Sequence, residues 1–154
     1  MEIGDRFPDF RLPDADGNIL DSADLEGVTY ILYFYPRDNT SGCTKEALGF
    51  NEVFERLAAR KVRIIGVSKD SPGSHRKFAD KHDLKFTLLS DQDLQLIKAA
   101  GAWGKKMMYG RETEGTVRST YIVGPDGTVK AAWPKVRVEG HAAQVCSEAE
   151  RLTE

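Results

Sequence analysis

Two short apolar runs separated by an amphipathic segment constrain the fold of this chain most. Residues 28–35 (VTYILYFY) and 62–68 (VRIIGVS) are rich in β-branched and aromatic side chains. Such runs indicate interior strands of a sheet that is covered on both faces. Between them, residues 44–60 carry apolar side chains at steps of three and four, which is typical of a helix with one buried face. The three segments predict a βαβ unit with a right-handed crossover.

The rest of the sequence predicts more helices and, towards the C-terminus, an antiparallel pair of strands. A turn signal at residues 14–18 (DADGN) lies between apolar stretches and indicates a small N-terminal β-hairpin. Residues 101–106 (GAWGKK) match no phosphate-binding motif, and we interpret them as a substrate-facing or solvated loop. The other expected elements are a helix from Ser71 to about His82, a strand at 86–89, a helix capped by Asp91, strands at 118–123 and 128–133 around the turn GPDG, and a helix at 140–152.

These elements together predict an α/β protein with a mixed central sheet, helices on both faces and an N-terminal hairpin extension. The chain has 154 residues, a length that suits a single domain over 1–154. Its net charge is −2, with acidic and basic residues interspersed, which gives no electrostatic footprint for nucleic acid or an anionic membrane. The start of the chain (MEIGDRFPDF) does not resemble a signal peptide, so we expect a cytoplasmic protein whose partners are small molecules or other proteins.

Cysteine usage also limits the function. The chain has two cysteines, Cys43 and Cys146, and its three histidines are His75, His82 and His141. None of these has metal-ligand spacing with another, so no metal site is expected, and we interpret the histidines as surface residues. Two cysteines are too few for a disulfide framework, and in a reducing cytosol they are expected to be thiols.

The sequence around Cys43 predicts a reactive thiol. If a strand ends near residue 35 and a helix begins near residue 44, Cys43 lies in the first turn of that helix, beyond the carboxyl end of the strand. Free N–H groups and the helix dipole stabilise a thiolate there, and Arg118 is a candidate neighbouring cation. Gly42 allows close approach to the backbone, Thr40 offers a hydroxyl, and Pro36 ends the strand. The alternative is a buried cysteine that acts as a small hydrophobe.

The spacing of Pro36, Thr40 and Cys43 matches the PxxxTxxC motif and resembles the active site of peroxiredoxins. Further stretches are similar to the bacterioferritin comigratory protein branch, or Q type: FYPRDNTSGCTKEA, VSKDSPGSHRKFADKH, LLSDQDLQLIKAAGAWGKKMMYG, VRSTYIVGPDGTV and KVRVEGHAAQV. The resemblance implies a thioredoxin-like fold and a thiol peroxidase that reduces hydrogen peroxide and organic hydroperoxides in antioxidant defence. It implies no metal or organic cofactor, and a monomer.

The resemblance also implies roles for individual residues. Cys43 would be the peroxidatic cysteine, Thr40 would hydrogen-bond the peroxide, Pro36 would shield the thiolate, and Arg118 would hold both thiolate and substrate. Gly42 would support this arrangement. Glu46 corresponds to an acid that helps to orient active-site groups in the family, although by local pattern it is also an ordinary acid in the first turn of a helix.

The sequence departs from the family at the resolving cysteine. The two usual positions hold Leu48 and Ala79. We therefore predict a single-cysteine mechanism, in which thioredoxin, glutaredoxin or a small thiol attacks the Cys43 sulfenate directly. Two alternatives stay open: Cys146 resolves Cys43, or the protein is a peroxide sensor or binding module that uses Cys43 as a switch. A thioredoxin-type disulfide oxidoreductase is disfavoured, because Glu46 occupies the second cysteine position of a Cys-x-x-Cys motif.

Overall fold

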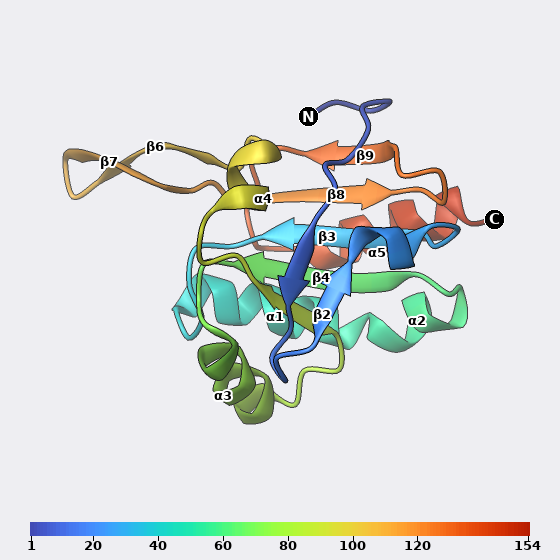
Figure 1. Ribbon diagram of the computed structural model, residues 1–154, viewed down its shortest axis with the longest axis horizontal. Helices are drawn as coiled ribbons and strands as arrows, with labels where there is room; N and C mark the ends of the chain where they lie inside the picture. Colours follow the sequence, from blue (N-terminus) through green and yellow to red (C-terminus); the bar gives the residue numbers. More distant parts are fainter.

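A five-stranded mixed sheet forms the centre of the molecule (Figure 1). The computed structural model describes the backbone of residues 1–154 and the side chains of all of them except Met108. In spatial order the strands are β5 (Thr87–Ser90), β4 (Arg63–Ser68), β3 (Tyr30–Phe34), β8 (Ser119–Val123) and β9 (Val129–Trp133). The first three are parallel, whereas β8 is antiparallel to both β3 and β9. The predicted mixed sheet is confirmed.

Both faces of the sheet are covered, which explains why β3 and β4 have near-continuous apolar sequences. All five residues of β3 are buried. One face packs against α1 (Ser41–Glu52), α2 (Phe54–Ala59), α3 (Pro72–His82) and α5 (His141–Leu152). The other packs against a hairpin of β1 (Arg11–Pro13) and β2 (Ile19–Asp21), the short 3₁₀ helix η1 (Ser22–Leu25) and α4 (Gln95–Ala99). The predicted helices on both faces and the N-terminal hairpin are therefore confirmed.

The helix expected over residues 44–60 differs from the structure. It begins earlier, at Ser41, and is divided into α1 and α2 at Val53. The Val53 N–H bonds the Phe50 carbonyl, three residues back instead of four, so the backbone tightens for one turn and regular α-helix is interrupted. The third expected helix starts later than predicted, at Gln95, although the Asp91 carboxylate does accept hydrogen bonds from the backbone N–H groups of Gln95 and Ile97.

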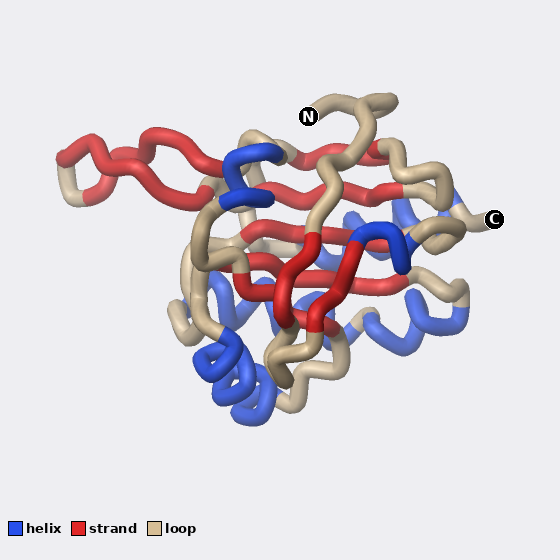
Figure 2. The backbone as a smooth tube through the Cα atoms, in the orientation of Figure 1, coloured by secondary structure: helices blue, strands red, loops and turns tan.

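The loop prediction is wrong for residues 103–106, which form a strand, whereas residues 101 and 102 precede that strand. This segment belongs to a second hairpin of β6 (Trp103–Met108) and β7 (Arg111–Thr116), which projects from the body of the molecule (Figures 1 and 2). The turn residues Tyr109 and Gly110 have φ values of 52° and 76°, the positive values that tight two-residue hairpins require. Strand β7 is mostly exposed and half of its residues are charged, so the sequence lacks the apolar alternation by which half-buried strands are identified.

None of the helices in the described part of the chain combines the length and the apolar surface that crossing a bilayer requires.

Candidate active site

Cys43 lies where the sequence placed it, in the first turn of a helix. The chain leaves β3, passes through a loop at residues 35–40, and enters α1 at Ser41. Thr40 is the N-cap residue, but its side chain makes no capping hydrogen bond, so the first N–H groups of α1 keep their positive potential. Cys43 is 1% exposed. A negative charge on its sulfur is stabilised electrostatically at this helix end.

Arg118 contacts both Cys43 and Glu46. It lies just before β8, the antiparallel neighbour of β3, and its Nη2 donates a hydrogen bond to Cys43 Sγ at 3.4 Å. Its Nη1 donates to Glu46 Oε1 at 2.7 Å. Partial burial would lower the pKa of Arg118, but the charges of Glu46 and then Cys43 hold it above its ordinary value. Arg118 is therefore a permanent cation beside the sulfur.

Gly42 makes room for this contact. A Cβ atom at residue 42 would lie 3.2 Å from Arg118 Nη2, closer than ordinary van der Waals contact. A Cβ there would shift the guanidinium by a few tenths of an ångström, so glycine favours the position that Arg118 takes beside Cys43. The group that approaches the backbone at Gly42 is thus the cation of the site.

Glu46 is an almost completely buried acid, 2% exposed. Burial raises its pKa to about 7, even though the charge and hydrogen bond of Arg118 act in the opposite direction. Its Oε2 has no hydrogen-bond partner among the described residues. The carboxyl group of Glu46 therefore changes its charge near neutral pH. It does so in direct contact with Arg118, which in turn contacts Cys43.

We predict that this titration lowers the stability of the protein as the pH rises. The folded state holds the Glu46 proton more tightly than an ordinary glutamate with a pKa of 4.5 does, up to about 7. The stabilisation is complete below pH 4.5 and is lost as the pH rises through 7, a loss of about 3 kcal/mol. Urea unfolding of two variants, Cys43→Ser and Cys43→Ser/Glu46→Gln, measures the difference at several pH values without the neighbouring thiol. A difference that stays constant from pH 4.5 to pH 8 contradicts the assignment.

Thr40 and Pro36 belong to the loop at residues 35–40, which precedes Cys43 in the sequence. The Thr40 hydroxyl is exposed and donates to the Arg37 carbonyl at 3.0 Å, which leaves its lone pairs free to accept a hydrogen bond. Pro36 is half-buried and follows the last ladder bond of β3, from Tyr35 N–H to the Val67 carbonyl at 3.1 Å. Since proline has no N–H, the ladder stops there and the chain turns into the loop.

Cys146 is a core residue of α5. It is 0% exposed and belongs to the same apolar cluster as Cys43, and both thiols are free. Burial raises the pKa of Cys146, which keeps it a neutral thiol. Of the two usual resolving positions, Leu48 is 40% exposed on α1 and Ala79 is buried on α3.

The interpretation of the histidines as surface residues is wrong for two of them. His75 is 0% exposed and His141 is 4% exposed. His141 Nε2 contacts Thr120 Oγ1 at 2.8 Å, and burial, with the nearby charge of Arg118, lowers the pKa of His141 to about 4. The overlooked signal is spacing: His75 precedes Phe78 and Ala79 of the buried face of α3 by three and four residues.

Lys106 is a further charged residue near the site, and its sequence segment, which has no strand pattern, gives no sign of this. It lies on β6 and is half-buried. Burial and then the charge of Arg118 lower its pKa, while the charge of Cys43 acts to raise it. The hairpin thus places a second cation in the electrostatic environment of the thiol.

Comparisons with known proteins agree with this arrangement. A family model described as AhpC/TSA family matches residues 3–132. The peroxiredoxin Bcp homologue of Coxiella burnetii is 43% identical over 145 residues, covering 94% of this chain and 96% of that protein. Peroxiredoxin Bcp of Bacillus subtilis is 38% identical over 154 residues, covering 100% of this chain and 98% of that protein.

Solved structures agree as well. The bacterioferritin comigratory protein of Xanthomonas campestris superposes with a TM-score of 0.89 at 36% identity, covering 94% of this chain and 92% of that one. A cysteine-to-serine variant of peroxiredoxin Q from Xylella fastidiosa gives a TM-score of 0.94 at 34% identity, covering 100% of this chain and 98% of that one.

A thioredoxin-like α/β fold with a cysteine at the start of a helix, and these relatives, define the chain as a thiol peroxidase of the peroxiredoxin class. The chain belongs to the AhpC/TSA family, and its relatives place it with the bacterioferritin comigratory proteins, or Q-type peroxiredoxins.

Proposed function

We propose that Cys43 is the peroxidatic residue of a single-cysteine enzyme that reduces hydrogen peroxide and organic hydroperoxides. The observation that carries the proposal is the position of the Arg118 guanidinium, which donates one hydrogen bond to Cys43 Sγ and another to Glu46 at the start of α1. Organic substrates are supported by the relative from Xanthomonas campestris, whose structures are described in terms of alkyl peroxide reduction activity.

In the first step the Cys43 thiolate attacks one peroxide oxygen. The O–O bond breaks, the sulfur becomes a sulfenate, and the proton of the peroxide passes to the other oxygen, which leaves as water or an alcohol; the sulfenate then takes up a proton from solvent to give the sulfenic acid. Negative charge develops on the leaving oxygen, so donors aimed at it lower the barrier. The Arg118 guanidinium and the first N–H groups of α1 supply them, and Thr40 accepts the hydrogen bond of the peroxide O–H.

In the second step an external thiol attacks the sulfenate sulfur, releasing water and leaving a mixed disulfide. A second thiol then attacks this disulfide and regenerates the Cys43 thiol. An external reductant is favoured because the usual resolving positions hold Leu48 and Ala79, and because burial raises the pKa of Cys146 and so disfavours its thiolate. Cys43 is itself 1% exposed, so the first turn of α1 has to open before the thiol reaches it.

The proposed reductant is thioredoxin, glutaredoxin or a small thiol. A reducing compartment keeps both cysteines as thiols between turnovers, which favours the cytoplasm. By its resemblance to the Q-type branch, the protein is proposed to act as a monomer with one catalytic domain over residues 1–154. No organic cofactor or metal takes part in the proposed cycle.

The experiment that tests the single-cysteine mechanism is the intact mass, under non-reducing conditions, after one equivalent of hydrogen peroxide. We expect Cys43 to gain one oxygen, and a sulfenate trap such as dimedone to capture it there. Loss of two hydrogens with a linked Cys43–Cys146 peptide, or a doubled mass, would show that Cys146 resolves the sulfenate. Repeated additions of peroxide with excess thiol separate a turning-over peroxidase from a sensor that reacts once.

A further inference from the structure

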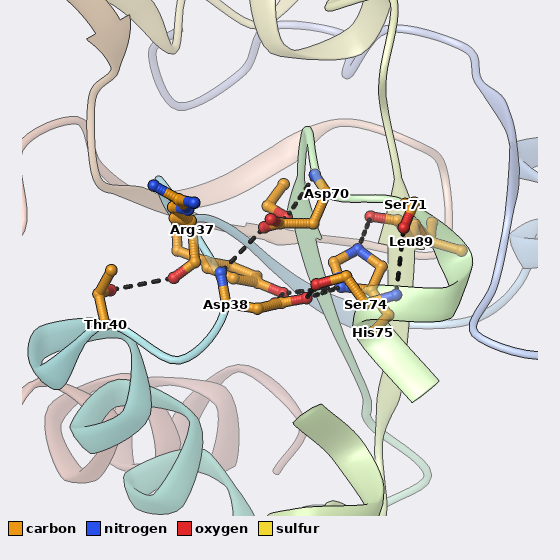
Figure 3. A network of polar contacts seen from close by, with 10 residues as sticks. Arg37, Asp38, Thr40, Asp70, Ser71, Ser74, His75 and Leu89 are labelled. Carbon is orange, nitrogen blue, oxygen red and sulfur yellow. Dashed lines mark hydrogen bonds and ion pairs between the residues drawn. The ribbon is translucent and has the colours of Figure 1, made fainter. Parts of the chain in front are cut away.

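The loop in front of Cys43 is held by a buried polar network centred on Asp38, which is 6% exposed (Figure 3). Three side chains contact its carboxylate: Tyr35 donates to Oδ1 at 2.6 Å, Ser74 donates to Oδ2 at 2.8 Å, and His75 Nδ1 lies 2.7 Å from Oδ2. The Asp38 backbone N–H donates to Asp70 Oδ2 at 2.9 Å. Both the main chain and the side chain of this loop residue are therefore fixed.

His75 connects the network to the central sheet. Its Nε2 lies 3.0 Å from the carbonyl oxygen of Leu89 on β5. A carbonyl only accepts hydrogen bonds, so Nε2 carries a proton. Its Nδ1 faces the Asp38 carboxylate at 2.7 Å, a distance that needs a second proton between the two atoms. The ring thus donates a hydrogen bond from each of its nitrogens and links Asp38 to β5.

We propose that the Asp38–His75 pair is a positioning device for the reaction of Cys43 with peroxide. The pair fixes the loop that carries Thr40, and so it sets where the peroxide lies relative to the sulfur. This inference rests on the proposed role of Cys43. Neither residue touches the reacting atoms, so both are positioning residues.

The contacts around Asp38 explain why this loop residue has to be held in place. Asn39, next to Asp38, has a φ of 63°, a left-handed conformation that asparagine adopts readily and that turns the chain between Asp38 and Thr40. Thr40 follows, and its hydroxyl bonds the carbonyl of Arg37 on the other side of Asp38 (Figure 3). The position of the Thr40 oxygen therefore depends on how the backbone at Asp38 is held. Movement of about 1 Å in a substrate-positioning group can cost up to about 10²-fold in rate.

The groups around the ring explain why Asp38 keeps its charge although it is buried. The titratable groups that face the ring are Asp38, Asp70 and Tyr35, and a ligand atom of each of the two acids lies within 4.8 Å of a ring nitrogen. Burial would raise the pKa of Asp38, but the hydrogen bond and charge of His75, with the hydroxyls of Tyr35 and Ser74, bring it below its ordinary value. Asp38 is consequently a carboxylate, and the Tyr35, Ser74 and His75 side chains all contact its two oxygens.

A bound cation is a poorer explanation of the same cluster. Asp38, Asp70 and His75 have the spacing of a possible metal site. However, the Asp70 oxygen that receives the Asp38 N–H also accepts a hydrogen bond from Ser68 Oγ at 2.6 Å. The ring nitrogens of His75 already contact Asp38 and Leu89. These atoms have their partners within the protein, so the cluster serves as an internal support.

Two substitutions of His75 test the hydrogen bonds of its two ring nitrogens separately. The amide nitrogen of asparagine is as many bonds from Cα as Nδ1 is, so His75→Asn keeps a donor to Asp38 and loses the one to Leu89. The amide nitrogen of glutamine corresponds to Nε2, so His75→Gln keeps the donor to Leu89 and loses the one to Asp38. His82→Gln is the matched control, because His82 is on the same helix and outside the network.

The measurement compares two reactions of Cys43, sulfenate formation by hydrogen peroxide and alkylation by iodoacetamide, each followed by mass. Alkylation needs a thiolate and opening of the first turn of α1, because Cys43 is 1% exposed, but it needs no peroxide site. For His75→Gln we expect the peroxide rate constant to fall about tenfold or more while alkylation stays within about twofold. His75→Asn should restore most of the peroxide rate, and His82→Gln should leave both rates unchanged.

Equal losses in His75→Asn and His75→Gln, or parallel changes in the two reactions, would overturn the inference. If His75→Gln does not fold, Ser74→Ala decides, since it removes one donor to Asp38 and should lower only the peroxide rate, about threefold. An unchanged ratio of the two rates in Ser74→Ala would then overturn it. If wild-type Cys43 is not oxidised by peroxide, the proposed function fails instead, which is a different result.

Discussion

Replacing Cys43 by serine is expected to abolish peroxide consumption, whereas replacing Cys146 by serine is expected to leave it within about twofold of the wild type. A serine hydroxyl does not ionise near neutral pH, so the variant loses its nucleophile, and such losses commonly exceed about 10³-fold. Cys146 is 0% exposed in α5, and burial raises its pKa, so it stays a neutral thiol away from solvent. The two residues should therefore differ completely in their effect on turnover.

The measurement is steady-state peroxide consumption with three reductants in turn: thioredoxin with its reductase, glutaredoxin with glutathione, and dithiothreitol. Thermal unfolding of both serine variants is the control, because both residues belong to the same apolar cluster. A Cys146→Ser variant that forms the Cys43 sulfenate normally but no longer turns over would contradict the single-cysteine mechanism. Activity in Cys43→Ser would contradict the assignment of the nucleophile itself.

The sequence was sufficient for the parts of the fold that repeat a local pattern. β3 and β4 could be predicted because strands that are buried on both faces need uninterrupted apolar sequences. The place of Cys43 followed from the strand that ends before it and the helix that begins around it. The hairpin of β6 and β7 could not be predicted in this way, since β7 is exposed over most of its length and half of its residues are charged.

The candidate site was predictable only in part, because its contacts join residues far apart in the sequence. Arg118 and Glu46 are 72 positions apart, and only the pairing of β8 with β3 brings the arginine to α1. Asp38 and His75 are 37 positions apart, and a lone aspartate in a polar loop gives no sign of burial. The roles of Thr40 and Pro36 come from the PxxxTxxC resemblance, whereas the geometry adds the hydroxyl contact of Thr40.

Replacing Arg118 by alanine is expected to lower the rate constant for peroxide oxidation of Cys43 by about 10² to 10³, the usual cost of removing one preorganised donor. The variant loses the hydrogen bond to Cys43 Sγ at 3.4 Å and the positive charge that we propose stabilises the leaving oxygen. Arg118→Lys should recover only a small part of the rate. The single ammonium group of lysine cannot replace the planar guanidinium group, which reaches Cys43 Sγ and Glu46 Oε1 with two separate nitrogens.

Loss of the arginine also leaves Glu46 buried without its ion pair, so Arg118→Ala could react slowly because it is unstable. Arg118→Ala/Glu46→Gln separates the two effects, since it removes the buried charge together with its partner. We expect this double variant to be more stable at pH 8 than Arg118→Ala alone, because the carboxyl group with a pKa of about 7 in the wild type is no longer present to ionise. Stopped-flow oxidation at that pH should still be slow. If the double variant regains the wild-type rate, Arg118 acts on the fold rather than on the peroxide.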